Sequence, residues 1–245
     1  MAEVHSPLEQ FTIKTLIQLP ELGGYAIHFT NSSFWMVVSV LVCYGLFMVG
    51  LRRASLVPTR MQSMVEVTYQ FISDTLRENA GEAGRPYFPF IFSVFLFVLF
   101  CNLMGIIPYS FTATSHLAVT FALALLVFVI CTIIGFVKGG SHFLEHFWMP
   151  DVPLALRPVV CVLEVCSYFI RPASLSLRLA ATMMSGHLIM KLFASFVIMM
   201  GFAGILPFAF LVGFTVFEIF IAILHAYIFT FLSCVYLNDA LGGAH

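Results

Sequence analysis

The chain has 245 residues, of which 61% are hydrophobic and only 9% are charged, and its mean hydropathy is +1.02. Soluble domains carry about 25% charged residues, so the composition excludes an ordinary soluble protein and predicts an integral membrane protein. The net charge of −1 gives no argument for a nucleic-acid partner. Runs of short alternating strands, which would indicate a membrane β-barrel, do not occur. We therefore expect an all-α integral membrane protein that forms a single membrane domain.

The first half of the chain predicts an external segment, three membrane spans and one helix of a different kind. Residues 1–32 are polar enough to lie outside the membrane. Apolar runs about one bilayer long predict spans at 33–51, 88–108 and 117–137. In 59–80 the apolar residues recur every three or four positions among charged ones, which predicts an amphipathic helix lying in the membrane interface.

The last two apolar stretches, 158–199 and 202–237, are too long for upright spans. As continuous helices they would run about 63 and 54 Å, against a hydrocarbon core of about 30 Å. Either Pro172 and Pro207 interrupt them, or both lie steeply oblique to the membrane. We favour a long, tilted hairpin that leans on the surface of another protein.

Loop charge predicts the orientation of the chain. The 109–115 turn has no charged residue, whereas the loops that follow the first and third spans are basic. By the positive-inside rule, the N-terminus is outside, these basic loops are cytoplasmic, and five crossings leave the C-terminus inside. The basic residues are Arg52, Arg53, Arg60, Arg77, Arg85, Lys138 and Arg157.

A polar stripe follows one face of the 158–199 helix, because its members are spaced by three or four residues. Serine and threonine alone would indicate ordinary helix contacts within a membrane. A guanidinium at mid-membrane, however, costs about 2.5–3.5 kcal/mol on insertion scales, and such residues usually mark functional sites. Arg178 is the centre of this predicted site. The stripe consists of Glu164, Ser167, Arg171, Ser174, Arg178, Thr182 and Ser185.

A second polar group is predicted near the outer ends of the two long helices. His187 and Lys191 lie one turn apart, and Glu218 and His225 lie two turns apart on the following helix. Because antiparallel helices would bring His187 and Glu218 together, the pair is either a structural ion pair or part of a proton path. Histidine and glutamate chains mark proton relays in membranes, so we favour the proton path.

Four segments carry a resemblance to a known family. They are Arg171-Pro-Ala-Ser-Leu-Ser-Leu-Arg178-Leu with Gly186-His187 after it, Asn102-Leu-Met-Gly-Ile-Ile-Pro-Tyr-Ser-Phe-Thr-Ala-Thr-Ser-His116, Leu224-His-Ala-Tyr-Ile-Phe-Thr-Phe-Leu-Ser-Cys-Val-Tyr236 and His5-Ser-Pro-Leu-Glu-Gln-Phe. Together they span nearly the whole chain in order. The sequence resembles the a subunit of rotary F-type ATP synthases, the stator of the membrane proton channel.

The resemblance implies a tilted hairpin against a ring of c subunits, with Arg178 facing each ring carboxylate as it passes. It implies that His187 and Glu218 line an outer half-channel and that Glu164 lies in an inner one. His225 occupies a place where glutamine is common in the family, and Thr182 one where asparagine is common.

The resemblance also implies the setting in which the chain works. Its partners would be the c-subunit ring, b-type peripheral stalk subunits, the rest of the complex and the lipid membrane, with protons as cargo and no nucleic acid. ATP chemistry would lie in partner subunits, so the chain would be no enzyme by itself, and no cofactor or metal is expected. A bacterial plasma membrane is the favoured location, with a mitochondrial inner membrane as the alternative.

Two other functions compete with this interpretation. A proton-coupled secondary transporter would carry internal repeats with interrupted helices in matching positions, and the sequence shows no such repeat. An intramembrane metalloprotease is suggested by His142-Phe-Leu-Glu145-His146, which fits the His-x-x-Glu-His zinc pattern. That segment is bounded by glycine and proline and has no obvious third ligand downstream, which favours solvated loop residues instead.

Overall fold

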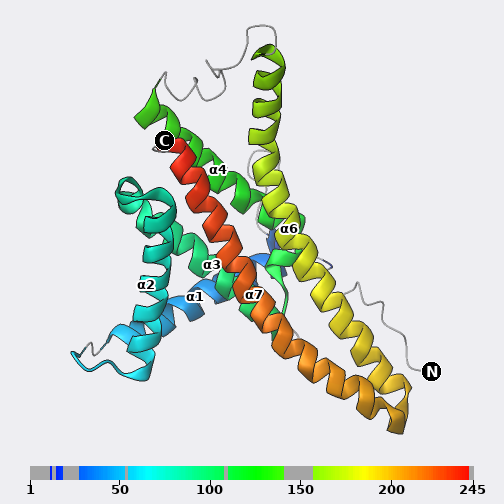
Figure 1. Cartoon of the computed structure of the whole chain (residues 1–245). Coiled ribbons are helices and arrows are strands. Elements are labelled where there is room, and N and C mark those ends of the chain that lie inside the picture. The colour runs from blue at the N-terminus through cyan, green and yellow to red at the C-terminus, as the bar shows by residue number, and fades with distance from the viewer. Residues whose placement is uncertain are drawn as a thin grey trace. The chain divides into compact units, whose positions relative to one another are not determined.

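The computed structural model describes residues 12, 15–18, 28–52, 55–107, 110–140 and 157–242, most of which are helical (Figure 1). Every helix except α2 is long and apolar enough to cross a membrane, which gives five candidate spans in the described part of the chain. The prediction of an all-α membrane protein with five such helices is therefore confirmed. The helices are α1 (Asn31–Leu51), α2 (Arg60–Ala80), α3 (Phe88–Ile106), α4 (Leu117–Gly139), α6 (Arg157–Met199) and α7 (Ile205–Ala240), with short 3-10 turns η2 (Glu82–Tyr87), η3 (Ala113–Ser115) and η4 (Gly201–Gly204).

A small antiparallel strand pair precedes α1 and was not predicted from the sequence. Strands β1 (Thr15–Gln18) and β2 (His28–Thr30) pair with Thr15 opposite Thr30. The strands are rich in threonine and β-branched or aromatic residues, which favour extended backbone. The pair is too short to alter the all-α class.

The amphipathic helix α2 has clear start and stop signals. The side chain of Thr59 accepts a hydrogen bond from the backbone nitrogen of Gln62, which satisfies one of the unpaired donors at the helix start. Gly81 ends the helix with a φ of 60°, a left-handed conformation that glycine adopts without strain. Ile72 and Leu76 are buried and mark the packed face of α2.

Both long stretches at the C-terminal end form long helices. Helix α6 runs from Arg157 to Met199 with Pro172 inside it, so this proline does not interrupt it. Helix α7 begins at Ile205 and places Pro207 in its first turn, where the missing N–H would have no partner within the helix. The sequence left open whether these prolines interrupt the two helices. In the structure both helices continue through them.

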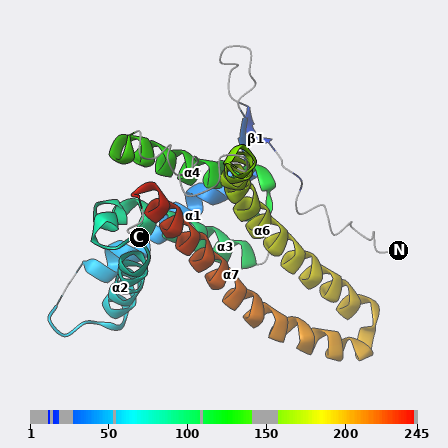
Figure 2. The same cartoon turned by 45° about the horizontal axis from the view of Figure 1, so that its top comes forward.

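The chain divides into two compact units, and each long helix contributes to both. Unit 1 comprises Met1–Val49, Leu96–Val119 and Leu179–Ala226, and unit 2 comprises Gly50–Phe95, Thr120–Arg178 and Tyr227–His245. In unit 1, α6 and α7 run side by side from the tight η4 turn (Figures 1 and 2). Phe193 and Phe210 stack across this hairpin with their ring centres 4.1 Å apart.

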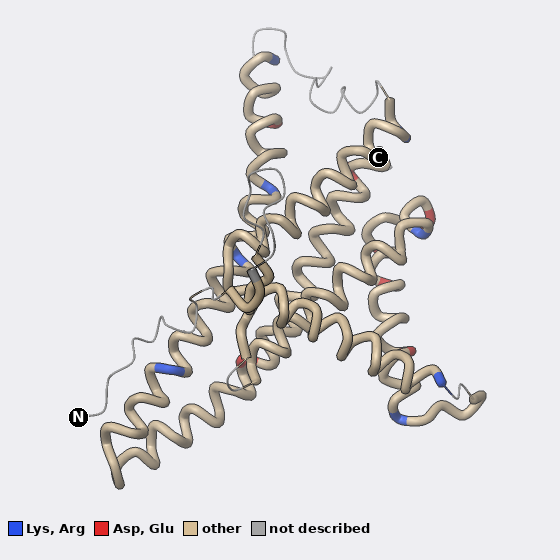
Figure 3. Tube along the Cα trace, turned by 180° about the vertical axis from the view of Figure 1, so that it is seen from behind, with Lys and Arg blue, Asp and Glu red and all other residues tan. Residues whose placement is uncertain are grey.

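Charged residues are sparse along the described helices (Figure 3). Large apolar side chains, in contrast, are widely exposed. Exposed valine, leucine and phenylalanine residues recur along α1, α4, α6 and α7. A soluble protein rarely exposes so much contiguous apolar surface, so these faces are suited to lipid or to other membrane proteins.

Candidate functional site

Unit 1 contains a buried histidine–glutamate pair. Nε2 of His187 on α6 lies 3.8 Å from Oε1 of Glu218 on α7, and the two side chains are only 3% and 2% exposed. The pair forms because the two residues lie at similar distances before and after the η4 turn of an antiparallel hairpin. The structure thus brings together the two residues that the sequence proposed as partners.

Glycine at position 186 makes room for the carboxyl group of Glu218. A Cβ atom placed on Gly186 would lie 2.7 Å from Oε1 and 3.2 Å from the carboxyl carbon. Real Cβ contacts are longer than this, so any larger side chain would displace the carboxyl group. The sequence analysis quoted Gly186 only as part of a motif, whereas the structure gives it a steric role.

The carboxyl group of Glu218 has no direct hydrogen bond from the part of the chain that the structure describes. Both of its oxygens are buried and lack such a partner, as does Oδ1 of Asn102, a fully buried residue on α3. Nδ2 of Asn102 donates to the backbone oxygen of Ala222, one turn after Glu218 on α7. Buried polar groups are normally hydrogen-bonded, so this carboxyl group is unusual in being close to an imidazole and otherwise unsatisfied.

A third side chain, which the sequence analysis did not identify as a site residue, contacts the pair. Oγ1 of Thr112 lies 2.9 Å from Nε2 of His187, and both atoms are buried. Thr112 belongs to a fully buried segment, Ser110–Ser115, that links α3 to α4 in unit 1. The only signal in the sequence was that Thr112 lies within one of the motifs that carried the resemblance.

Unit 2 contains a different charged cluster around Arg171 on α6. One guanidinium nitrogen lies 2.5 Å from a carboxylate oxygen of Asp239 on α7, and the other lies 3.8 Å from Glu164. The same guanidinium lies 5.8 Å from the ring centre of Tyr236, within cation–π range. Arg171 and Asp239 are 27% and 34% exposed, so this cluster is only partly shielded from its surroundings.

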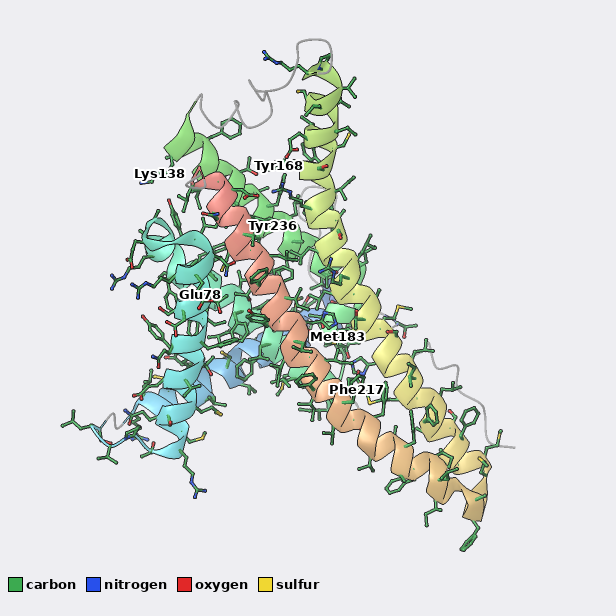
Figure 4. All side chains as sticks on the ribbon, in the orientation of Figure 1. Glu78, Lys138, Tyr168, Met183, Phe217 and Tyr236 are labelled. Carbon is green, nitrogen blue, oxygen red and sulfur yellow. The ribbon has the colours of Figure 1, made fainter. Side chains whose placement is uncertain are left out.

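Aromatic side chains flank the Arg171 cluster in unit 2. Tyr168 on α6 and Tyr236 on α7 are labelled in Figure 4. The hydroxyl of Tyr168 is 2.6 Å from Oγ1 of Thr132 on α4. With Arg171 and Asp239, the two tyrosines line a small cavity, so this cluster ties α4, α6 and α7 together.

The polar stripe on α6 lies on the less buried face of that helix. Arg178 is exposed, whereas Leu175, Leu179 and Met183 on the packed face are 3% exposed or less. The other exposed members of the stripe are Ser167, Ser174 and Ser185, and the half-buried members are Glu164, Arg171 and Thr182.

The remaining predicted residues lie close in sequence to the buried pair. Lys191 is one turn after His187 on α6, and His225 is two turns after Glu218 on α7. Both side chains are half-buried. His142, Glu145 and His146 of the zinc-like pattern lie outside the described residues, and the described ones contain no group of three or more ligands that could hold a metal.

These features define a multi-pass, all-helical membrane protein with a buried histidine–glutamate pair and an exposed arginine on one of its long apolar helices. The family model described as ATP synthase A chain matches residues 33–238. The chain therefore belongs to the ATP synthase A chain family.

Three relatives, each named ATP synthase subunit a, match nearly the whole chain. The protein of Ehrlichia ruminantium (strain Welgevonden) is 49% identical over 241 residues, covering 96% of this chain and 98% of the relative. That of Parvibaculum lavamentivorans is 49% identical over 247 residues, covering 98% and 94%. That of Wolbachia sp. subsp. Drosophila simulans is 45% identical over 237 residues, covering 96% and 98%.

Proposed function

We propose that the chain is the stator proton-channel subunit of a rotary ATP synthase. It provides two offset half-channels to the carboxylates of a c-subunit ring and so couples proton flow to ring rotation. The chain itself performs no ATP chemistry, which belongs to partner subunits of the complex. The observation that carries the proposal is the exposed position of Arg178 on a helix that is long and apolar enough to cross a membrane.

The outer half-channel passes through His187 and Glu218. Support comes from their burial, their 3.8 Å separation and the lack of direct protein hydrogen bonds to the carboxylate oxygens within the described chain. Hydrogen bonds from protein donors would stabilise the charged form of the carboxylate and oppose its protonation. Without such bonds, the Glu218 carboxylate can accept a proton from the imidazole more easily. Lys191 and His225 lie one and two turns away on the same helices, and we assign them to the lining of this path. The pairing of a titrating imidazole with a carboxyl group favours protons over sodium as the cargo.

Arg178 separates the two half-channels and discharges the ring. A protonated ring carboxyl is neutral and can pass through lipid, whereas its charged form would bear a large desolvation cost. When the carboxyl reaches the guanidinium, an opposite charge within about 4–6 Å lowers its pKa by about 1–3 units. The proton then leaves to the inner side, driven in part by about 2.3 kcal/mol per 100 mV of membrane potential.

The inner half-channel passes Glu164. This side chain is half-buried and lies 3.8 Å from the guanidinium of Arg171, which Asp239 also holds. Ser167, Ser174, Thr182 and Ser185 continue the polar stripe on either side of Arg178 and contribute hydroxyl groups to the face that meets the ring. Such a face can accept a proton near Arg178 without the cation itself moving.

In this proposal the chain lies in a bacterial plasma membrane with its N-terminus outside and its C-terminus inside. The arrangement of basic loop residues supports the orientation, and the three relatives above come from bacteria. The tilted α6–α7 hairpin leans on the c-subunit ring, and b-type stalk subunits hold the chain as part of the stator.

Replacement of Arg178 tests the proposal. We expect Arg178→Ala to abolish ATP synthesis driven by a proton gradient, while the complex still assembles, because no fixed charge remains to discharge the ring. Arg178→Lys should also fail if the planar donor fork is needed as well as the charge. The measurement is ATP synthesis in membrane vesicles, with assembly checked by co-purification of the complex. Normal coupled synthesis by Arg178→Ala would refute the proposal.

A further inference from the structure

The buried segment between α3 and α4 places one hydroxyl group against the imidazole of His187. Oγ1 of Thr112 is 2.9 Å from Nε2, the same nitrogen that faces Oε1 of Glu218 at 3.8 Å. A single ring nitrogen therefore has two neighbours, one hydroxyl and one carboxyl. Any proton that moves between His187 and Glu218 through this nitrogen must change the hydrogen bond that Thr112 makes.

The hydroxyl of Thr112 has a second partner that allows this change. It can donate to the backbone oxygen of Gly105 at 3.4 Å, in the last turn of α3. When Nε2 carries a proton, Thr112 accepts from it and donates to Gly105. When Nε2 is unprotonated, the hydroxyl rotates and donates a hydrogen bond to the nitrogen instead. The hydroxyl of Ser110, 3.0 Å from the same carbonyl oxygen, can then satisfy Gly105.

Close packing holds Thr112 where this exchange is possible. A Cβ atom on Gly105 would lie 2.7 Å from Cγ2 and 2.8 Å from Oγ1 of Thr112. The glycine thus lets the threonine side chain lie directly against the end of α3. Thr112 itself is 1% exposed, and His187 is 3% exposed, so bulk water does not substitute for the hydroxyl at this nitrogen.

We propose that Thr112 is a positioning residue whose hydroxyl holds Nε2 of His187 in both of its protonation states and so lets the imidazole exchange a proton with Glu218. This inference rests on the proposed function of the chain. In the step itself, the N–H bond at Nε2 of the imidazolium breaks and an O–H bond forms on the Glu218 carboxylate. The imidazole keeps its proton on Nδ1, and two opposite charges become two neutral groups.

The other titratable groups of α6, α7 and the connecting segment are placed differently from Thr112. Glu218 faces it from α7, Lys191 lies one turn away on α6, and His116 ends the connecting segment. The ring of His116 stacks on Phe111 with centres 5.0 Å apart, and burial lowers the pKa of His116. From this connecting segment, it is the Thr112 hydroxyl that contacts Nε2 of His187.

The test compares threonine replacements in the complete complex, in inverted membrane vesicles that pump protons at the expense of ATP. Thr112→Val keeps the side-chain shape and removes the hydroxyl, and we expect it to slow pumping about tenfold, equivalent to about 1.4 kcal/mol. Thr112→Ser should restore most of the rate. The pH profile of Thr112→Val should move to lower pH, because the charge-assisted hydrogen bond from the imidazolium to Thr112 is the stronger of the two bonds that are lost.

Thr114→Val is the matched control. Thr114 is also 1% exposed in the same segment, and its hydroxyl has no hydrogen-bond partner in the described chain. The control should therefore pump at close to the unmodified rate with an unchanged pH profile. Equal rates and profiles for Thr112→Val and Thr114→Val would overturn the inference, as would failure of Thr112→Ser to restore pumping.

His187→Ala separates failure of this inference from failure of the proposed function. If His187→Ala stops pumping while Thr112→Val matches its control, only the role of Thr112 is wrong. If His187→Ala pumps normally, the outer path itself is wrong. Slow pumping in Thr112→Val together with serine rescue and the shifted profile supports both.

Discussion

The two charged clusters of this chain contain similar residues in different surroundings. In unit 1, Glu218 is 2% exposed, 3.8 Å from an imidazole and without a direct hydrogen bond from the described chain. In unit 2, Asp239 is 34% exposed and bound at 2.5 Å to a guanidinium that stays charged at any physiological pH. A permanent cation stabilises the charged form of a neighbouring carboxylate, so that carboxylate does not readily take up a proton. A buried carboxylate beside a titrating group can exchange its proton more readily, which is why we propose that the outer half-channel lies in unit 1.

The largest expected effect comes from removing the exchangeable carboxyl group. We expect Glu218→Gln to slow ATP-driven proton pumping at least about 10²-fold, which is within the usual contribution of a positioned acid–base group. The amide keeps the shape but can neither take nor release a proton at Oε1. Pumping in inverted vesicles measures this, and near-normal pumping would remove Glu218 from the path.

Exchanging the residue types at positions 187 and 218 tests whether the histidine and the glutamate act as a pair. The double variant with His187→Glu and Glu218→His keeps one carboxyl and one imidazole in contact. It should pump faster than either single replacement. A double variant no faster than the slower single one would mean that the two residues do not act as a pair.

A smaller effect is expected at Gly186. The added methyl group of Gly186→Ala would lie 2.7 Å from Oε1 of Glu218 and must push the carboxyl group aside. Overpacking of this kind costs about 1–3 kcal/mol, so we expect a partial loss of pumping with retained assembly. Gly213→Ala is the matched control, because a Cβ atom there meets nothing within 4 Å. Equal pumping by the two variants would show that Gly186 does not position the carboxyl group.

The smallest effect is expected in unit 2. Asp239→Asn removes the charge opposite Arg171 but keeps an oxygen that can accept its hydrogen bond. Partly exposed ion pairs contribute about 0–1 kcal/mol, so pumping should stay within a few-fold of normal, and the thermal stability of the complex should fall slightly. A loss as large as that of Glu218→Gln would mean that the ion pair is part of the proton path.

The fold was largely predictable because apolar runs of bilayer length indicate membrane helices directly in the sequence. The caps of α2, Thr59 and Gly81, are residue types that favour the start and the end of a helix. The effect of Pro172 was not predictable, since a proline can end a helix or lie within one, and neighbouring packing decides which. The β1–β2 pair was missed because seven residues in extended backbone leave almost no periodic signal.

The site was predictable only where periodicity along one helix or an assumed hairpin brought residues together. His187 and Glu218 were paired on that basis. Thr112 and Asp239 were missed because their contacts, to His187 and Arg171, join positions 75 and 68 residues apart. Gly186 was recognised only as part of a motif. Its steric role depends on the Glu218 carboxyl group that packs against it, and the sequence does not show that contact.

Disulfide cross-linking to the c-subunit ring tests the central claim most directly. Ser174 is exposed on the Arg178 face of α6, whereas Ser176 on the packed face is fully buried. In a complex without native cysteines, each serine would be replaced by cysteine and paired with a cysteine placed beside the ring carboxylate. We predict cross-linking with Ser174→Cys and none with Ser176→Cys. Cross-linking of Ser176→Cys but not of Ser174→Cys would show that the Arg178 face does not meet the ring.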